Sequence, residues 1–219
     1  MGIWGWWAFD VFTLISSYLS VDIISAQTIM RTLGLLTFMI PVGFSVACGI
    51  LVGRSIGQGS VAAIKHYYNL CMTLSIGVAL FQVIVLLICE NLIIAIFTNI
   101  DRIIIHIQAA WLIFNCFVIF DTTQGVASSA IRASGQQKKG AVITGVAYWV
   151  FGIPITLLMV FKFDLGTLGI WVGPTFACAF NTAAYLWIFN TINWGDLIVK
   201  AAQQREKDKF KRLSEAQPV

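Results

Sequence analysis

Six long apolar segments, separated by short polar breaks, constrain this chain more than any other feature of its sequence. They cover Ile3–Leu19, Ile23–Val52, Tyr68–Cys89, Ile103–Ile131, Ala141–Phe161 and Leu168–Ile192. A helix needs about 20 predominantly apolar residues to cross the hydrocarbon core of a bilayer. Barrel strands would alternate in polarity, which these segments do not, and a backbone in lipid must satisfy its own hydrogen bonds. The sequence therefore predicts an all-α integral membrane protein, a bundle of six transmembrane helices over residues 1–192.

The composition agrees with a membrane location and leaves no room for a soluble catalytic domain. Apolar residues make up 58% of the chain and charged residues 11%, whereas roughly a quarter of a soluble domain is charged. Such hydrophobicity excludes disorder, and the net charge of +4 is a poor argument for nucleic acid binding. The stretch 92–97 is apolar but too short to cross, so we expect an interfacial turn there rather than a seventh helix. We therefore expect that this protein is not an enzyme.

Lysine and arginine are distributed unevenly between the two sides of the predicted bundle. One side would carry Arg54, Lys65, Arg132, Lys138, Lys139, Lys200, Arg205, Lys207, Lys209, Lys211 and Arg212, against Arg102 and Lys162 on the other. Because cytoplasmic loops carry the excess of such residues, both termini are expected in the cytoplasm. Residues 193–219 would be a basic tail, solvated or, as the less favoured alternative, an amphipathic helix on an anionic leaflet.

Two prolines and the start of the chain also bear on the architecture. Pro41 and Pro154 lie inside apolar segments, where a missing amide donor kinks a helix; each is a candidate hinge or a passive bend. The first apolar segment follows Met1 and Gly2 directly, without the basic leader and cleavage site of a signal peptide. A piece of a longer protein would begin in the same way.

Two acids lie inside the predicted membrane segments. Asp10 and Asp121 lie about 10 Å and about 15 Å from the expected cytoplasmic ends of their helices, at the α-helical rise per residue. An ionised carboxylate is costly at such depth, so it would take up a proton in one state and release it when water or a cation arrives. This is the physical basis of proton coupling. The alternative is a neutral acid held by a hydrogen bond between helices.

Other polar groups accompany these acids. Asp121, Gln124 and Ser128 share one helix face with Gly125, which predicts a cavity-lining face. The candidate cavity residues on other segments are Gln27, Asn181, Trp7 and Tyr148. If the two aromatic rings face the cavity, they would bind organic cations by cation–π contact; the alternative is a belt of aromatic side chains at the membrane interface. Arg31 is expected to snorkel or to pair with an acid.

Several common site signals are missing. The glycine-rich stretch 53–59 lacks the Gly-Lys-Ser/Thr that follows in a phosphate-binding loop, so it is interpreted as a turn. The five cysteines form no close pair, and the two histidines lack companions for metal ligation. No cofactor and no metal are expected.

The order of several short motifs resembles the multidrug and toxic compound extrusion (MATE) transporters of eukaryotic type. The motifs are Trp6-Trp7-Ala8-Phe9-Asp10, Phe38 to Ser45, Val52 to Gly59, Asp121 to Val126, Ile131 to Gln137, Lys139-Gly140-Ala141, Tyr148 to Pro154, and Ile192-Asn193-Trp194. Each motif is weak by itself. Collinear over nearly the whole chain, they are specific.

The resemblance implies that the six segments correspond to the second of two six-helix lobes, helices seven to twelve of such a transporter. In the family, the lobes face each other across a cavity and export organic cations or acids in exchange for H⁺ or Na⁺. Asp121 would match the family's acid in helix ten, and Asp10 the second of two acids beside the Trp-Trp pair. The first of these acids is replaced here by Gly5, and the family's usual arginine and asparagine near the glycine-rich turn by Leu51 and Arg54.

The sequence thus favours the C-terminal half of a secondary antiporter that exports organic cations or other small xenobiotics or metabolites. Asp121 and Asp10 would couple transport to H⁺ or Na⁺, and Gln124, Ser128, Tyr148, Trp7, Gln27 and Asn181 would line the substrate cavity. The partners would be membrane lipids of a plasma, vacuolar or other endomembrane, and either a missing N-terminal lobe or a second copy of the chain. The alternatives are a non-transporting membrane subunit and a flippase for lipid-linked substrates.

Overall fold

The computed structural model describes the backbone of residues 2–215 and the side chains of residues 4–207, and this part of the chain contains helices and no strand. The elements are α1 (Gly2–Ser17), α2 (Val21–Gly57), α3 (Val61–Ile88), α4 (Glu90–Phe97), α5 (Asp101–Ala133), α6 (Gln137–Gly145), η1 (Val146–Gly152), α7 (Ile153–Leu157), η2 (Leu158–Lys162), α8 (Gly166–Thr191) and α9 (Trp194–Glu215). The expectation of an all-helical fold is confirmed.

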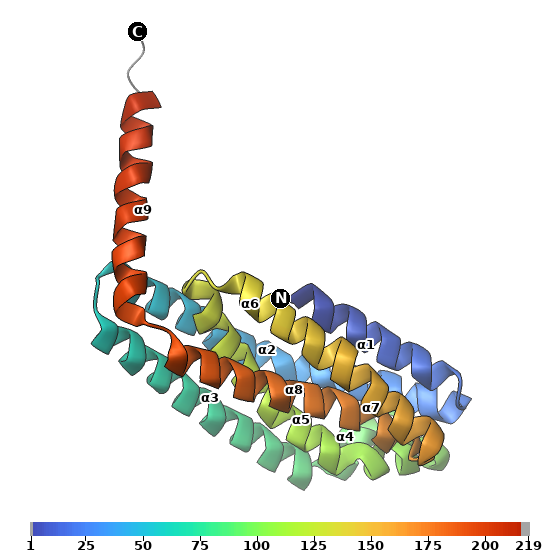
Figure 1. The fold of residues 1–219 in the computed structure, drawn as a ribbon. Coiled ribbons are helices and arrows are strands. Elements are labelled where there is room, and N and C mark those ends of the chain that lie inside the picture. The colour runs from blue at the N-terminus through green and yellow to red at the C-terminus, as the bar shows by residue number, and fades with distance from the viewer. Residues whose placement is uncertain (1, 216–219) are drawn as a thin grey trace.

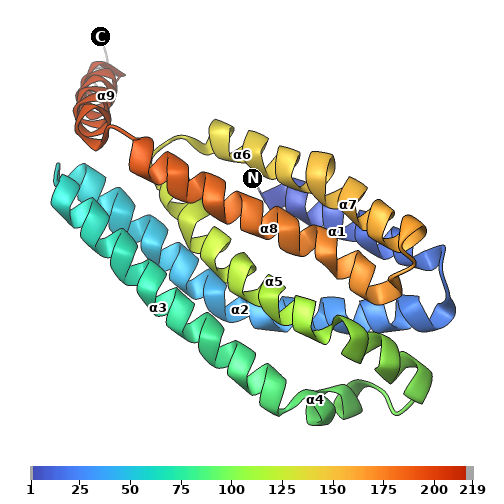
Figure 2. The same cartoon turned by 60° about the horizontal axis from the view of Figure 1, so that its bottom comes forward.

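Long helical rods, one for each predicted apolar segment, make up the bundle, because α6, η1, α7 and η2 follow one another as a single rod (Figure 1). In the described part of the chain, four rods are long and apolar enough to cross a membrane, over residues 21–57, 61–88, 101–133 and 137–162. The helices α1 (16 residues) and α8 (26 residues) are not among these four and run alongside them (Figure 2). The result is the integral membrane bundle that the sequence predicts.

The helix α5 lies at the centre and packs against both α2 and α8. One buried cluster joins α1, α2, α5 and α8 around Phe12, Met30, Phe114 and Trp171. A second cluster lies nearer to α9, around Val52, Ile64, Tyr185 and Phe189. Between these two clusters the facing helices carry polar side chains, and the candidate site lies there.

Some local structure differs from the sequence-based expectation. Residues 92–97, expected to be a turn, belong to the short helix α4, which has Glu90 in its first turn, where a negative charge favours the helix dipole. It is only 8 residues long, too short to cross a membrane. The helix α3 begins at Val61, several residues earlier than expected, because the Ser60 hydroxyl caps it by accepting a hydrogen bond from the amide of Ala63 at 3.2 Å.

The two prolines lie in different settings. Pro41 is inside α2, which continues on both sides of it. Pro154 lies near the start of α7, between the π-helical turns of η1 and η2. A wider π turn accommodates the proline ring and its missing amide without ending the rod. Their role as hinges stays a prediction.

The C-terminal segment forms α9, which leaves the bundle and runs across the direction of the other helices (Figure 1). Trp194 is buried, and Leu197, Ile198 and Ala201 pack against the second cluster. The guanidinium of Arg205 donates a hydrogen bond to the Gly57 carbonyl at 3.0 Å, at the end of α2. A Cβ on Gly57 would lie 2.6 Å from Arg205 Nη2, so a larger residue at this position would displace the guanidinium. The side chains of Phe210 and Leu213, part of the alternative interfacial helix, lie outside the described residues.

Candidate functional site

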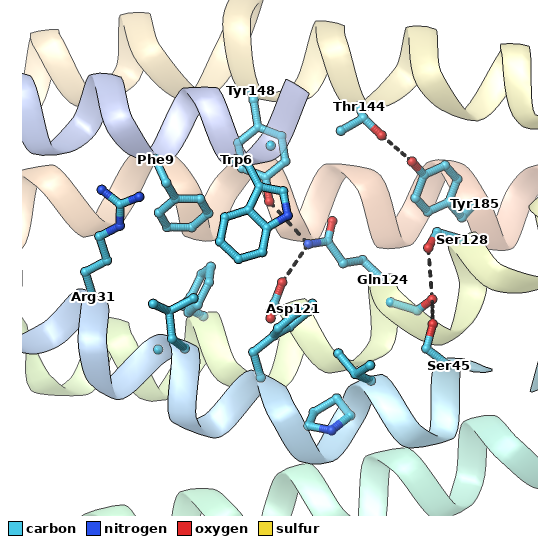
Figure 3. Close-up of a pocket in the computed structure, with 18 of the residues that line it drawn as sticks. Trp6, Phe9, Arg31, Ser45, Asp121, Gln124, Ser128, Thr144, Tyr148 and Tyr185 are labelled. Carbon is cyan, nitrogen blue, oxygen red and sulfur yellow. Dashed lines mark hydrogen bonds between the residues drawn. The ribbon is translucent and has the colours of Figure 1, made fainter. Parts of the chain in front are cut away.

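A cavity of about 410 Å³ lies between α1, α2, α5, the α6–η1 segment and α8 (Figure 3). Much of its wall is aromatic, from Trp6, Phe9, Phe38, Phe117, Trp171 and Tyr185. The charged side chains that line it are Asp121, Arg31 and Arg132. Its volume falls in the range of pockets that bind small organic molecules.

A hydrogen-bonded network centred on Gln124 holds Asp121 in place. Gln124 follows it by one helical turn, and its side-chain amide donates a hydrogen bond to Asp121 Oδ1 at 2.8 Å. The same amide nitrogen lies 3.2 Å from the Tyr148 hydroxyl. On the far side, Asn181 donates to the Gln124 carbonyl oxygen at 2.9 Å, which fixes the direction in which the amide points. The carboxylate is thereby held at a defined place in the cavity wall (Figure 3).

Hydroxyl groups line the other end of the cavity. Ser45 on α2 and Ser128 on α5 both donate hydrogen bonds to the Gly125 carbonyl, at 2.8 Å and 2.9 Å. Arg132 donates to Ser128 Oγ at 3.1 Å. The Ser45 contact joins α2 to α5 along this wall, and the other two lie within α5 (Figure 3). The face shared by Asp121, Gln124, Gly125 and Ser128 thus lines the cavity along its length.

Asp10 lies outside the lining of the cavity. Its side chain is 63% exposed and forms an ion pair of 2.6 Å with Arg31, which is 27% exposed and does line the cavity. The preceding residue, Phe9, takes the position that faces inward. The pairing expected for Arg31 is confirmed, whereas the two acids meet the cavity differently, Asp121 directly and Asp10 through Arg31.

The remaining predicted cavity residues are divided between the cavity and its surroundings. Tyr148 lines the cavity, whereas Trp7 is 58% exposed and is not among the lining side chains. Its neighbour Trp6 lines the wall instead. Gln27 and Asn181 are both 1% exposed and are not among the lining side chains, although Asn181 supports Gln124 through a hydrogen bond.

Sequence reasoning missed Trp6, Phe38, Trp171 and Tyr185 as lining residues. In a lipid-facing bundle, apolar side chains occur on every face of a helix, so no periodic signal marks them. In the described part of the chain, no group of three or more metal-ligating side chains occurs.

The fold and the site together define a helical membrane protein with a cavity between its helices. A family model described as MatE matches residues 2–158. The chain belongs to this family, as the motif order indicated.

Relatives and solved structures agree with this assignment. Multidrug and toxin extrusion protein 1 of Homo sapiens is 30% identical over 202 residues, which are 92% of this chain and 35% of that protein. The Oryctolagus cuniculus protein of the same name is 29% identical over 199 residues, which are 91% of this chain and 34% of that protein. The crystal structure of the eukaryotic MATE transporter AtDTX14 superposes with a TM-score of 0.86 at 22% identity, over 91% of this chain and 45% of that chain. The chain spans about a third of the length of these curated relatives.

Proposed function

We propose that this chain is the C-terminal lobe of a secondary antiporter that exports small organic molecules, organic cations among them, in exchange for H⁺ or Na⁺. Residues 1–192 would form the membrane lobe and residues 193–219 a cytoplasmic tail, with both termini on the cytoplasmic side. The observation that carries the proposal is the Asp121 carboxylate, held by Gln124 in the wall of a largely apolar cavity. Such an acid is a functional group by default inside a membrane.

The proposed exchange follows from competition for this carboxylate. Ionised Asp121 attracts a protonated amine strongly, because the surrounding wall screens charge poorly. A proton that binds to the carboxylate removes this attraction and releases the amine. Cargo and proton therefore occupy the site alternately, which is the condition for antiport.

Asp10 would act as the partner of Asp121 through Arg31. As long as Asp10 is ionised, it compensates the Arg31 guanidinium at 2.6 Å. When Asp10 is protonated, the Arg31 charge at the cavity wall is no longer compensated, so the protonation state of Asp10 sets how positive this wall is for a bound cargo. Gln124 and Tyr148 would contact the cargo beside Asp121.

The decisive experiment replaces Asp121 in the assembled transporter. We expect Asp121→Asn to abolish efflux driven by a pH gradient, with normal protein levels, because the amide carries no exchangeable charge. Efflux of a fluorescent organic cation from proteoliposomes measures this. Asp101→Asn is the matched control, since Asp101 is an exposed acid at the start of the same helix. Efflux retained by Asp121→Asn would remove Asp121 from the mechanism.

A non-transporting membrane subunit is the second candidate. The ion pair between Asp10 on α1 and Arg31 on α2 favours it, since such a pair also serves to hold two helices together. If the protein is such a subunit, neither the wild-type chain nor Asp121→Asn would support efflux.

A further inference from the structure

The wall of the cavity carries more positive groups than recognition of a cation requires. Arg31 and Arg132 line the wall together with the single acid Asp121. Gly5 also lines the cavity, at the position where the resemblance places a second acid. A site for simple organic cations gains nothing from guanidinium groups in its wall, because like charges repel in a medium that screens poorly.

Arg31 is held so that part of its guanidinium is free for a ligand. Its Nη2 forms the ion pair with Asp10 Oδ1 at 2.6 Å, and its Nη1 donates to the Thr13 hydroxyl at 3.2 Å. A guanidinium has more N–H donors than these two acceptors use. Among the described side chains, no further acceptor is recorded for it.

Arg31 and Asp121 lie apart along the cavity, with Phe9 and Trp6 also projecting into this region (Figure 3). Opposite charges at separate places select ligands that carry both charges at a matching separation. The aromatic side chains around them favour a flat, aromatic body for the same ligand.

We propose that Arg31 is an anion-binding residue of the cargo cavity, and that the cargo is an aromatic zwitterion whose acidic group binds Arg31 while its protonated amine binds Asp121. The inference rests on the proposed function for the role of Asp121, and it adds Arg31 as the residue that binds the acidic group of the cargo. A carboxylate suits the guanidinium because the two pair through parallel hydrogen bonds.

Asp10 has a defined place in this scheme. Its side chain accepts a hydrogen bond from only one nitrogen of the guanidinium, so it holds Arg31 in position while competing with the acid group of the cargo. Removal of Asp10 and removal of Arg31 must then change the affinity for a zwitterion in opposite directions. If Arg31 only fastened α1 to α2, the two removals would have the same effect.

The test is direct binding to the full chain, purified in lipid nanodiscs, by isothermal titration calorimetry. The probes are naphthylalanine, its amide, which lacks the acid charge, and its N-acetyl form, which lacks the amine charge. We expect the free amino acid to bind at least about tenfold more tightly than either derivative, which is the scale of one charge-assisted hydrogen bond. Arg31→Gln should abolish the preference over the amide, Arg31→Lys should keep part of it, and Asp10→Asn should strengthen binding of the free amino acid.

The control is Arg102→Gln, an exposed arginine on α5 outside the cavity, which should keep the preference. The inference is overturned if the amide binds the wild-type chain as tightly as the free amino acid, or if no member of the series binds. It is also overturned if Arg132→Gln, and not Arg31→Gln, removes the preference, or if Asp10→Asn and Arg31→Gln weaken binding alike. Wherever the amide binds the wild-type chain, its loss in Asp121→Asn would still support the proposed function, so the two failures are distinguishable.

Discussion

At the scale of single residues, Gly5 sets the charge of the cavity as much as Asp121 does. A Cβ built on Gly5 would lie 3.7 Å from the Tyr148 ring, an ordinary contact, so a longer side chain is compatible with the wall. The position lines the cavity, and the resemblance to MATE transporters places an acid there. The glycine therefore removes charge from the cavity without any steric need for its small size.

We expect Gly5→Glu to tighten binding of the naphthylalanine amide by about tenfold, because a second carboxylate beside an apolar wall attracts the amine. Titration calorimetry of the chain in nanodiscs measures the change. Gly5→Gln has the same size without the charge and should leave the affinity near that of the wild type. An equal gain in both variants would attribute the effect to contact area rather than to charge.

The residues that helix periodicity placed correctly are those whose polarity distinguishes them from lipid. Asp121, Gln124 and Ser128 share a face that cannot favour the acyl chains, and all three line the cavity. Trp6 and Trp7 differ in position by a single residue, and composition does not distinguish them, because both aromatic core and lipid accept an indole ring. Only the rotation of α1 against its neighbours decides which of the two faces inward.

At the scale of elements, the rod that runs from α6 to η2 packs very closely on α8. Gly173 on α8 faces the Thr156 hydroxyl and the backbone carbonyl of Gly152, and a Cβ there would overlap both atoms. Backbone atoms of a packed rod cannot move aside as the end of a flexible side chain can. The approach of α7 to α8 therefore requires glycine at this position.

We expect Gly173→Ala to destabilise the chain by about 1–3 kcal/mol, the usual range for an overpacked core position. Thermal unfolding in detergent, followed by circular dichroism, measures the loss. Gly77→Ala is the control, because a Cβ on Gly77 of α3 meets open space and alanine is the better helix former. A stability of Gly173→Ala equal to that of the control would show that the two rods separate without cost.

The apolar segments predicted the rods but not their ends or their internal irregularities. A hydrophobic run marks what lies in lipid, whereas the end of a helix depends on a few hydrogen bonds such as the Ser60 cap of α3. The π-helical turns around Pro154 follow from the packing of that rod on α8, which a single sequence does not contain. The sequence favoured a solvated tail over the helix α9 for the same reason, because the packing partners of Leu197 and Ile198 are known only in the folded bundle.

At the scale of the whole molecule, the exposed apolar side chains that line the cavity favour a second lobe across from it. Trp6 lines the cavity and is nevertheless 50% exposed, and Leu35 on α2 is a lining residue that is 37% exposed. The relatives contain about three times as much chain, since this chain covers 34–35% of their length. Transporters built from repeats place their binding sites between the two repeats.

We therefore expect the edge of the cavity to contact another polypeptide in the membrane. In a chain whose five native cysteines are replaced by alanine, a cysteine introduced by Leu35→Cys should be joined to that polypeptide by a reagent with one thiol-reactive and one photoreactive end, and mass spectrometry identifies the product. A product with twice the 24.2 kDa mass of the chain would identify a half-transporter that pairs with itself. A second MATE-type sequence in the product would identify a separate first lobe. Phe81→Cys on α3 is the control, because Phe81 is 66% exposed but not among the lining residues. Attachment of an unrelated protein at position 35 would favour the non-transporting subunit. Equal cross-linking from positions 35 and 81 would contradict a dedicated interface at the cavity, because random collisions in the membrane cross-link any exposed cysteine.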